Sequence, residues 1–369
     1  MKEVKTVINL VDQLSSVNFG IWHAAIASSS FLWKNHGVRT LIAVPKTDYP
    51  FDREGFPHAE PVFLEKTDAK SAVNFFSGFS PEKTLVVSHG TWRFPTQWAA
   101  QAKKAGFCWV YTPHGMLEPW SMSQKKWKKW AYFFLKEKPL ARQADVVRAV
   151  GGPEAENLKK HFARVIRIPN GIYPGDILTN EKPEKPLTFL FLGRLHHKKG
   201  VMPLLRAWKK SRLFSNPGFR LLVAGTPDGE EEKVAAWWKE NPGSNVDITG
   251  PAFGEKKRNL LSQSSFYVLP SLSEGFPTSV VEAMAAGLIP MISEGCNFPE
   301  VFSENLGIEV HQDESDLVEK LNRAGALPEE YIRNLSVKNR LYVQENYFWE
   351  SIAEAQFTLF TSLLNGKAV

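Results

Sequence analysis

The feature that most limits how this chain can fold is an alternation, repeated along its length, of short apolar runs and longer amphipathic stretches. Short, continuous apolar runs are typical of strands buried on both faces, and the stretches between them are long enough for crossover helices. Chains with this alternation form parallel sheets covered by helices. The sequence therefore predicts an α/β protein.

The alternation occurs in two series. A segment with three prolines and several charges, residues 174–187, interrupts it and is interpreted as a linker. We therefore expect two Rossmann-like domains, 1–173 and 174–349, facing each other across a cleft at the carboxyl ends of their strands. The expected strands are 5–11, 39–45, 84–90, 108–115, 145–150, 164–171, 187–193, 219–225, 246–250, 264–271 and 288–293. The expected helices include 21–37, capped by Gly37, and 201–211, 231–240, 256–263 and 279–287.

Composition agrees with two buried cores, because the 369 residues are 43% hydrophobic. The two cysteines, Cys108 and Cys296, lie far apart and support neither a disulfide framework nor a zinc site. The N-terminus reads as a strand and not as a signal peptide, and no apolar run approaches the roughly 20 residues of a membrane span. We expect a cytoplasmic protein.

Charge is uneven along the chain. Residues 1–180 hold 24 Lys and Arg against 15 Asp and Glu, a net charge of +9, whereas the remainder has 21 against 24, a net charge of −3. The first half is therefore expected to meet something anionic, either a membrane surface or a nucleic acid.

Residues 269–287 form the most informative segment. A strand runs into a Ser/Gly/Pro loop, and a helix begins near Pro277 or Thr278, so backbone N–H groups are expected to converge there on an anion or on sugar hydroxyls. Glu274 precedes the helix, and Glu282 lies about one turn into it. Two carboxylates placed in this way can hold two parts of one extended ligand.

Cationic side chains follow another expected strand, in residues 189–200. The strand ends at Gly193, which places Arg194 and Lys199 at the carboxyl edge of the sheet. A departing diphosphate needs its negative charge stabilised, and Arg and Lys supply that charge. The intervening His196, His197 and Lys198 are assigned no role.

These segments resemble family 4 of the glycosyltransferases, a retaining family with the GT-B fold of two Rossmann-like domains. Its hallmark is a Glu, seven residues and a second Glu, which Glu274 and Glu282 match. The resemblance implies that Glu274 holds the donor sugar and Glu282 the nucleotide ribose. It also implies a donor-binding backbone cradle at Gly275, Phe276, Pro277 and Thr278.

The same family has Gly-Arg-Leu, three residues and Lys-Gly where this chain has Arg194 and Lys199. The resemblance implies catalytic roles for both, beside the departing diphosphate, and retention of anomeric configuration. No closely spaced aspartates of the kind that hold Mg²⁺ or Mn²⁺ follow a strand. We therefore expect no metal and no cofactor, with a nucleotide-sugar as the donor substrate.

The first domain carries looser matches to the family. His114, in a Pro-His-Gly loop after a strand, corresponds to a family histidine close to the donor sugar. Gly20 corresponds to one of two glycines that approach the donor or acceptor, and Glu300 to a residue near the nucleotide. The terminal helix, 350–369, resembles one that packs back on the acceptor-side first domain.

Residues 121–138 bear on the acceptor side of the reaction. If this segment is a helix, its lysines and aromatic residues give a basic face beside an aromatic one. Two interpretations stand: peripheral contact with an anionic membrane, at the inner face of the plasma membrane, or an ordinary helix with solvated lysines. The former favours a lipid-linked glycan acceptor in bacterial surface polysaccharide or lipopolysaccharide assembly. No nucleic-acid-binding module is recognised. The residues assigned to this side are Lys125, Lys126, Trp127, Lys128, Lys129 and Trp130.

Other functions use the same fold. A nucleotide-sugar epimerase and a phosphorylase are alternatives within the enzymes, and a non-catalytic nucleotide-sugar-binding protein is the alternative outside them. A glycosyltransferase, of the hexosyltransferase type, is the function that the motifs favour.

Overall fold

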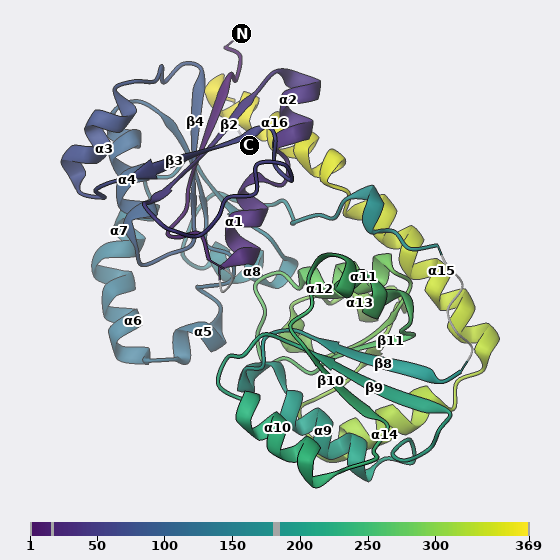
Figure 1. Cartoon of the computed structure of the whole chain (residues 1–369). Coiled ribbons are helices and arrows are strands. Elements are labelled where there is room, and N and C mark those ends of the chain that lie inside the picture. Colours follow the sequence, from purple (N-terminus) through teal and green to yellow (C-terminus); the bar gives the residue numbers. More distant parts are fainter. Residues whose placement is uncertain (1, 16–17, 180–184, 368–369) are drawn as a thin grey trace. The chain divides into compact units, whose positions relative to one another are not determined.

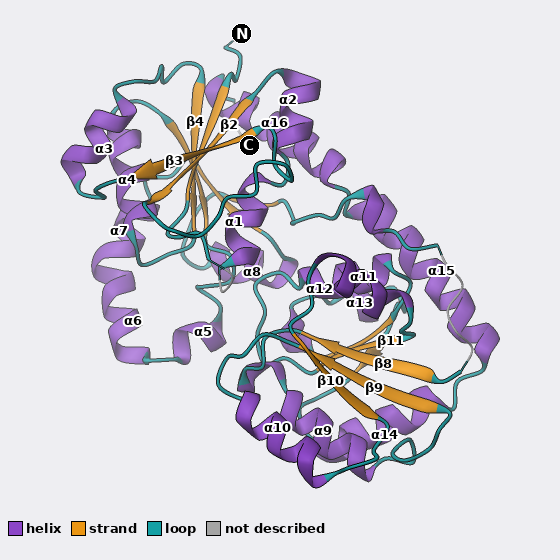
Figure 2. Cartoon of the chain, in the orientation of Figure 1, coloured by secondary structure: helices purple, strands orange, loops and turns teal. Residues whose placement is uncertain are grey.

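The computed structural model describes residues 2–15, 18–179 and 185–367, and divides into two compact units. Unit 1 comprises Met1–Gly171 and Trp349–Val369, and unit 2 comprises Ile172–Phe348. Each unit has one parallel sheet with helices on both faces (Figures 1 and 2). The prediction of two Rossmann-like domains is confirmed. Residues 180–184 of the expected linker, and the last two residues of the expected terminal helix, lie outside the described residues.

The sheet of unit 1 has the strand order β3-β2-β1-β4-β5-β6-β7, with every neighbouring pair parallel. Its central strands are buried on both faces, as their continuous apolar sequences predict. The strands are β1 (Thr6–Leu10), β2 (Arg39–Pro45), β3 (Ala59–Leu64), β4 (Thr84–His89), β5 (Cys108–Thr112), β6 (Val146–Ala149) and β7 (Val165–Arg167).

The helices of unit 1 lie on both faces of this sheet: α3, α4 and α7 on one, and α1, α2 and α16 on the other (Figure 1). Asp68 caps α3 by accepting from Ser71 N, and Gly37 ends α2 in the left-handed conformation, as predicted. The helices are α1 (Phe19–Ile26), α2 (Ser29–His36), α3 (Ala69–Phe76), α4 (Phe94–Lys104), α5 (Pro119–Ser123), α6 (Lys126–Tyr132), the π-helix η1 (Phe133–Glu137), α7 (Lys138–Ala141), α8 (Gly152–Lys159) and α16 (Trp349–Leu364).

The sheet of unit 2 has the order β10-β9-β8-β11-β12-β13 and is also parallel throughout. Its strands are β8 (Leu187–Leu192), β9 (Phe219–Ala224), β10 (Val246–Gly250), β11 (Phe266–Leu269), β12 (Ile289–Ile292) and β13 (Ile308–Glu309). Its helices are η2 (Pro174–Asp176), η3 (His197–Lys199), α9 (Val201–Lys210), α10 (Glu231–Glu240), α11 (Gly254–Ser262), α12 (Thr278–Ala285), η4 (Glu294–Cys296), α13 (Glu300–Ser303), α14 (Glu314–Gly325) and α15 (Glu329–Asn346). Helices α9, α10 and α14 cover one face, and α11, α12 and α13 the other (Figure 1).

Several elements differ from the predictions, among them the first helix and the edge strands β3 and β13. The expected helix 21–37 is two helices, α1 and α2, separated at Ala27 and Ser28. Ser28 Oγ is hydrogen-bonded to Gln356 Oε1 of α16 at 2.8 Å, so the break in the helix is tied to a tertiary contact. Strand β3 was not predicted, because Pro61 and the charged Glu60 interrupt its apolar pattern; it is an edge strand, where a proline is tolerated.

Strand order gives each unit one switch point, at which the chain changes its direction of growth across the sheet. In unit 1 it lies between β1 and β4, and in unit 2 between β8 and β11. Ligands of open α/β sheets bind at the carboxyl ends of the strands at such points. The residues that follow these four strands are therefore the first candidates for chemistry.

Candidate active site

The switch point of unit 2 holds a buried ion pair. Lys199 Nζ, in the loop after β8, lies 2.7 Å and 2.8 Å from the two carboxylate oxygens of Glu274, in the loop after β11. Burial alone would raise the pKa of Glu274, but the charges of Lys199 and Lys198 and the hydrogen bonds from Lys199 and Ser271 outweigh it and lower that pKa. The carboxylate is therefore ionised at neutral pH.

Further charged groups surround this pair. Arg194 Nη1 lies 2.6 Å from Asp228 Oδ2, in the loop after β9. Burial lowers the pKa of Lys198, and the charges of Glu274, Lys199 and Arg194 also act on that group. Two predicted catalytic residues, Arg194 and Lys199, thus lie together with Glu274, while Lys198 and Asp228 join the site without having been predicted.

The loop that carries the lysines is fixed by close packing on the exit of β11. Gly200 has a φ of +77°, and a Cβ there would lie 2.6 Å from Pro270 O. Only glycine allows this approach together with the left-handed backbone. The Lys198 carbonyl then accepts hydrogen bonds from Leu272 N at 2.8 Å and from Gln312 Nε2 at 2.9 Å. Backbone contacts thus set the position of both lysines.

In the loop before α12, some backbone N–H groups donate to backbone carbonyls of the protein. Glu274 N donates to Gly295 O at 2.7 Å, and Thr278 N donates to Phe276 O at 3.0 Å. The Phe276 ring packs against Tyr347, with centroids 5.9 Å apart. Two of the N–H donors expected to bind a ligand, those of Glu274 and Thr278, are therefore already hydrogen-bonded within the protein.

The second predicted carboxylate, Glu282, lies in α12 and is half-buried. Its Oε1 accepts from Lys257 Nζ of α11 at 2.8 Å. Glu274 and Glu282 both act electrostatically on the buried Tyr267 hydroxyl, whose pKa is raised, chiefly by burial. The two carboxylates therefore belong to one region of unit 2.

The switch point of unit 1 holds a pair of histidines. His89, at the end of β4, and His114, after β5, have Nδ1 and Nε2 respectively 2.8 Å apart. His89 Nε2 lies 2.9 Å from Asn9 Oδ1, on β1. Burial, aided by the charge of Arg148, lowers the pKa of His114 to about 3, so this ring is neutral at neutral pH. Of these residues, only His114 was predicted.

A buried carboxylate holds the loop of His114. Glu154, in the first turn of α8, accepts from Gly115 N at 2.5 Å and from Val150 N at 2.7 Å. Burial raises its pKa to about 7, despite these two backbone hydrogen bonds. This residue was not predicted, and no motif in the sequence marks it.

Two further predicted residues, Gly20 and Glu300, lie at the starts of helices. Gly20 is in the first turn of α1, where an added Cβ would meet no atom of the described residues within 4 Å. Within that part of the chain, no steric contact requires glycine at this position. Glu300 begins α13 in unit 2.

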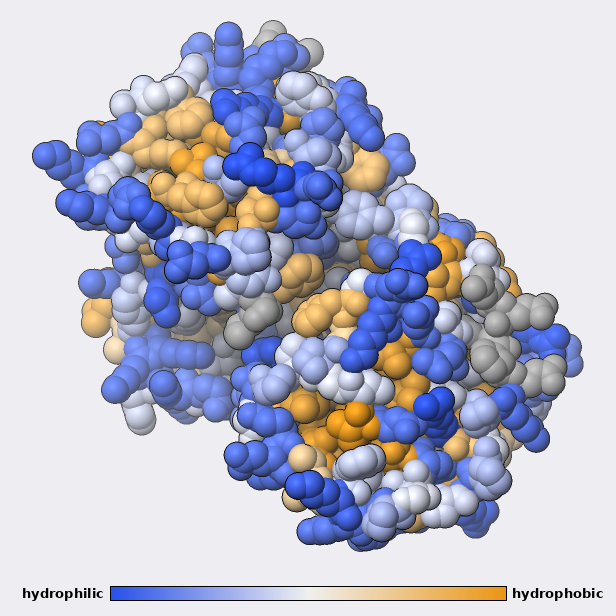
Figure 3. Space-filling view, viewed as in Figure 1, coloured by the Kyte–Doolittle hydropathy of each residue, from blue (hydrophilic) through white to orange (hydrophobic). Residues whose placement is uncertain are grey.

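The basic aromatic segment is not one helix, contrary to the expectation for residues 121–138. Lys125 has a φ of +53° and separates α5 from α6. Trp127 is 86% exposed, but Lys129 Nζ donates back to Ser121 O at 2.6 Å, and Trp130 stacks on Phe134. The surface over α6 is mainly hydrophilic, with a small hydrophobic group at its outer edge (Figure 3).

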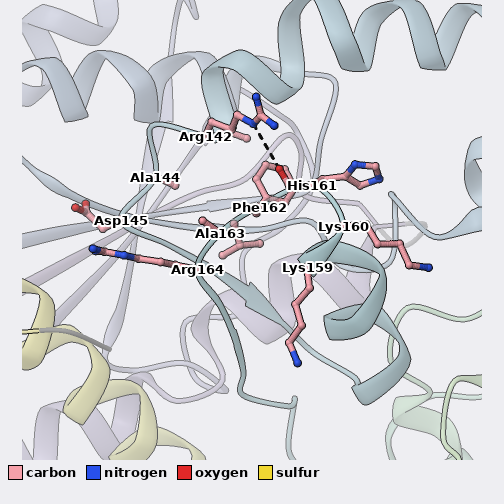
Figure 4. A pocket seen from close by; sticks show the side chains of 11 residues that line it. Arg142, Ala144, Asp145, Lys159, Lys160, His161, Phe162, Ala163 and Arg164 are labelled. Atoms are coloured by element: carbon pink, nitrogen blue, oxygen red, sulfur yellow. Dashed lines mark hydrogen bonds between the residues drawn. The ribbon is translucent and has the colours of Figure 1, made fainter.

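One hollow of about 650 Å³ in unit 1 lies away from these residues (Figure 4). It is lined from the starts of β6 and β7, at the amino ends of the strands, and Arg142 Nε donates there to His161 O at 3.5 Å. It is therefore on the edge of the sheet opposite to the histidine pair.

Fold and site together define a protein of the GT-B class, with cations and carboxylates at the switch point of its second sheet. Residues 177–339 match the family described as glycosyl transferases group 1, and residues 70–171 match the glycosyl transferase 4-like domain. The chain therefore belongs to the family 4 type of glycosyltransferases.

Individual relatives agree with this assignment. A GDP-mannose:cellobiosyl-diphosphopolyprenol alpha-mannosyltransferase of Komagataeibacter xylinus is 30% identical over 58% of this chain and 55% of its own length. The chain thus matches about half of that relative. Sucrose-phosphate synthase of Thermosynechococcus elongatus has the same fold, with a TM-score of 0.78 at 19% identity over 98% of this chain and 100% of the other. A glycosyltransferase of Rickettsia africae also has this fold, with a TM-score of 0.76 at 16% identity over 99% of this chain and 100% of the other.

None of the described helices is both long and apolar enough to cross a membrane.

Proposed function

We propose that this chain transfers a sugar from a UDP- or GDP-sugar to a glycan acceptor, with retention of anomeric configuration and without a metal ion. The observation that carries the proposal is the convergence of Arg194, Lys198 and Lys199 with Glu274 at the switch point of unit 2. Fixed cations in a partly buried site stabilise the charge that develops on a leaving diphosphate. They also take the place that a metal ion has in other transferases.

The bond between the anomeric carbon and the diphosphate oxygen breaks, and the acceptor hydroxyl forms a bond to the same face of that carbon. The departing phosphate takes the proton of the acceptor, so no side chain is a covalent nucleophile. Arg194 and Lys199 receive the charge, while Glu274 accepts hydrogen bonds from hydroxyls of the sugar.

Before the donor binds, these groups are paired with each other. Lys199 is bonded to Glu274, Arg194 to Asp228, and Lys257 to Glu282. A diphosphate can replace the carboxylate as partner of Arg194, and a ribose diol can donate to Glu282. We propose that the role implied by the resemblance also holds for His114, which would orient a hydroxyl of the donor sugar. We further propose that the loop 275–278, Gly20 and Glu300 contact the donor.

We propose a lipid-linked glycan as the acceptor, in bacterial surface polysaccharide or lipopolysaccharide assembly. The name of the Komagataeibacter xylinus relative, an enzyme acting on a diphosphopolyprenol acceptor, supports this class and makes GDP-mannose the first donor to assay. Trp127, 86% exposed among Lys125, Lys126 and Lys128, supports peripheral contact with an anionic membrane at the cytoplasmic face.

The test is an assay of donor turnover with a panel of UDP- and GDP-sugars in EDTA, with and without lipid-linked acceptors. We expect nucleoside diphosphate release that depends on the acceptor. Release of sugar phosphate with added phosphate would instead indicate a phosphorylase, and a change of sugar configuration without release an epimerase. Binding of a nucleotide-sugar without turnover of any donor would leave a non-catalytic binding protein.

A further inference from the structure

Three side chains at the switch point of unit 1 form a hydrogen-bonded chain from Asn9 through His89 to His114. The Nε2 atom of His89 lies 2.9 Å from Asn9 Oδ1, and its Nδ1 atom lies 2.8 Å from His114 Nε2. The two rings are inclined by only 24° with centroids 5.1 Å apart, so they meet edge to edge. Each of these two contacts requires one donor and one acceptor.

The direction of every bond follows from one fixed group, the amide of Asn9. Asn9 Nδ2 donates to the backbone carbonyl of Leu41 at 3.3 Å, and a carbonyl can only accept. The amide oxygen therefore faces His89, and it can only accept as well. His89 must carry its proton on Nε2.

The second bond then has only one direction. His89 is fully buried, and both burial and the neighbouring His114 and Arg148 disfavour its charged form, lowering its pKa. A neutral ring with its proton on Nε2 has a bare lone pair on Nδ1. That lone pair accepts from His114, which must therefore carry its own proton on Nε2.

A cation fixed nearby adds to the effect of burial in disfavouring the charged form of both rings. Arg148 is buried, and it donates to the carbonyls of Ile168 at 2.9 Å and Pro169 at 2.8 Å. Its charge acts on both His89 and His114. Protonation of either ring would place a second positive charge beside it.

We propose that His89 is a positioning residue that, with Asn9, holds His114 in the tautomer protonated on Nε2 and thereby presents His114 Nδ1 as a hydrogen-bond acceptor. Within the described part of the chain, no protein group is hydrogen-bonded to that atom. The group of the substrate that meets it must donate, so it is a sugar hydroxyl and not a phosphate oxygen. This last step rests on the proposed function, whereas the tautomer does not.

The tautomer is measured directly in the wild-type chain labelled with ¹⁵N-histidine. Two-bond ¹⁵N–¹H correlations distinguish the protonated ring nitrogen, and comparison with H114Q assigns the signals of His114. We expect His114 and His89 each to have the proton on Nε2 at neutral pH. A His114 proton on Nδ1 would overturn the inference, whatever the activity of the enzyme.

Variants test the positioning role. N9L removes the acceptor that orients His89, and N9D keeps an acceptor in its place. We expect N9L to mix the His114 tautomers and to lower kcat about tenfold or more, the effect of losing one hydrogen bond of about 1.4 kcal/mol, and N9D to restore a single tautomer and most of kcat.

Tautomer populations and transfer rates, compared among the variants, separate this inference from the proposed function. If N9L and N9D have equal tautomer populations, the chain from Asn9 does not set the tautomer, and the inference fails while transfer stands. If the tautomers are as proposed but H114Q transfers at the wild-type rate, the contact with a sugar hydroxyl is wrong. Donor sugars that each lack one hydroxyl complete the test. The donor without the hydroxyl that meets His114 should be transferred by H114Q and by the wild type at similar rates.

Discussion

Lys199 Nζ bridges both carboxylate oxygens of Glu274, at 2.7 Å and 2.8 Å, and each side chain is about nine-tenths buried. Burying two charges is costly, but the contacts of Glu274 with Lys199 and Ser271 and the charge of Lys198 together keep its carboxylate ionised. Two apolar residues could fill the same space without that cost. A charge pair at a switch point therefore fits a site in which each charged group exchanges its protein partner for a group of the substrate.

We predict that K199M lowers the free energy of unfolding by about 3–5 kcal/mol, because Glu274 is left buried without its partner. The double variant K199M/E274Q should recover much of this loss, since no charge remains uncompensated. Denaturant unfolding of both proteins measures the difference. The matched control is K210M, which breaks an exposed pair with Glu314 and should change stability by less than about 1 kcal/mol. Equal effects of K199M and K210M would contradict the prediction that Glu274 depends on Lys199 for its charge compensation.

The buried Glu154 predicts a pH dependence of stability. Its pKa in the folded chain is raised to about 7 from an ordinary 4.5, so the folded chain binds a proton more tightly than the unfolded chain. Stability contributed by this proton is present below pH 4.5 and is lost as the pH rises to 7.

The wild type should therefore lose roughly 3 kcal/mol relative to E154Q between pH 4.5 and 7. Unfolding curves at several pH values test this, with E156Q, an exposed glutamate of the same helix, as the control. A constant difference between wild type and E154Q over that range would show that Glu154 is ionised in the folded chain throughout.

For Glu282 we predict a defect in donor binding. E282Q removes the charge that holds Lys257 and weakens hydrogen bonds to a ribose diol. The Kd for the nucleoside diphosphate should rise about tenfold or more, with a smaller effect on kcat. Calorimetry measures it, with E255Q on the exposed start of α11 as control. An unchanged Kd would remove Glu282 from the nucleotide site.

Membrane contact is predicted to depend on Trp127. W127S should reduce binding to vesicles rich in anionic lipid, and binding of the wild type should weaken as salt is raised. W238S is the matched control, because Trp238 is also exposed, at 51%, but lies in unit 2. If neither variant differs from the wild type in sedimentation with vesicles, the lysines around Trp127 are simply solvated.

The sequence was most informative where an apolar strand is followed directly by polar residues. Glu274, Arg194 and Lys199 could be placed from that pattern, since the carboxyl ends of parallel strands meet at one edge. His89, the last residue of β4 (Thr84–His89), could have been found in the same way. Asp228 also follows a strand, β9, but no motif marks it, and Glu154 depends on the tertiary approach of α8, so neither was identified.

Helix continuity was less predictable. Residues 121–138 have helix-forming side chains throughout, yet the positive φ of Lys125 divides the segment. Lysine seldom adopts that conformation, so no local pattern in the sequence predicts the break. The segment is therefore not one helix over its whole length, but the contiguous helices α6, η1 and α7 carry all the assigned residues except Lys125, and Trp127 is exposed.

The most direct measurement is release of nucleoside diphosphate by R194A, in EDTA, with saturating acceptor and the donor that the wild type prefers. The account predicts that the wild type keeps its full rate in EDTA, and that R194A loses about two to three orders of magnitude in kcat. R220A, which breaks an Arg–Asp pair with Asp247 at the opposite ends of the strands, should keep the wild-type rate. Loss of wild-type activity in EDTA, or a near-wild-type rate for R194A, would contradict charge neutralisation by the protein.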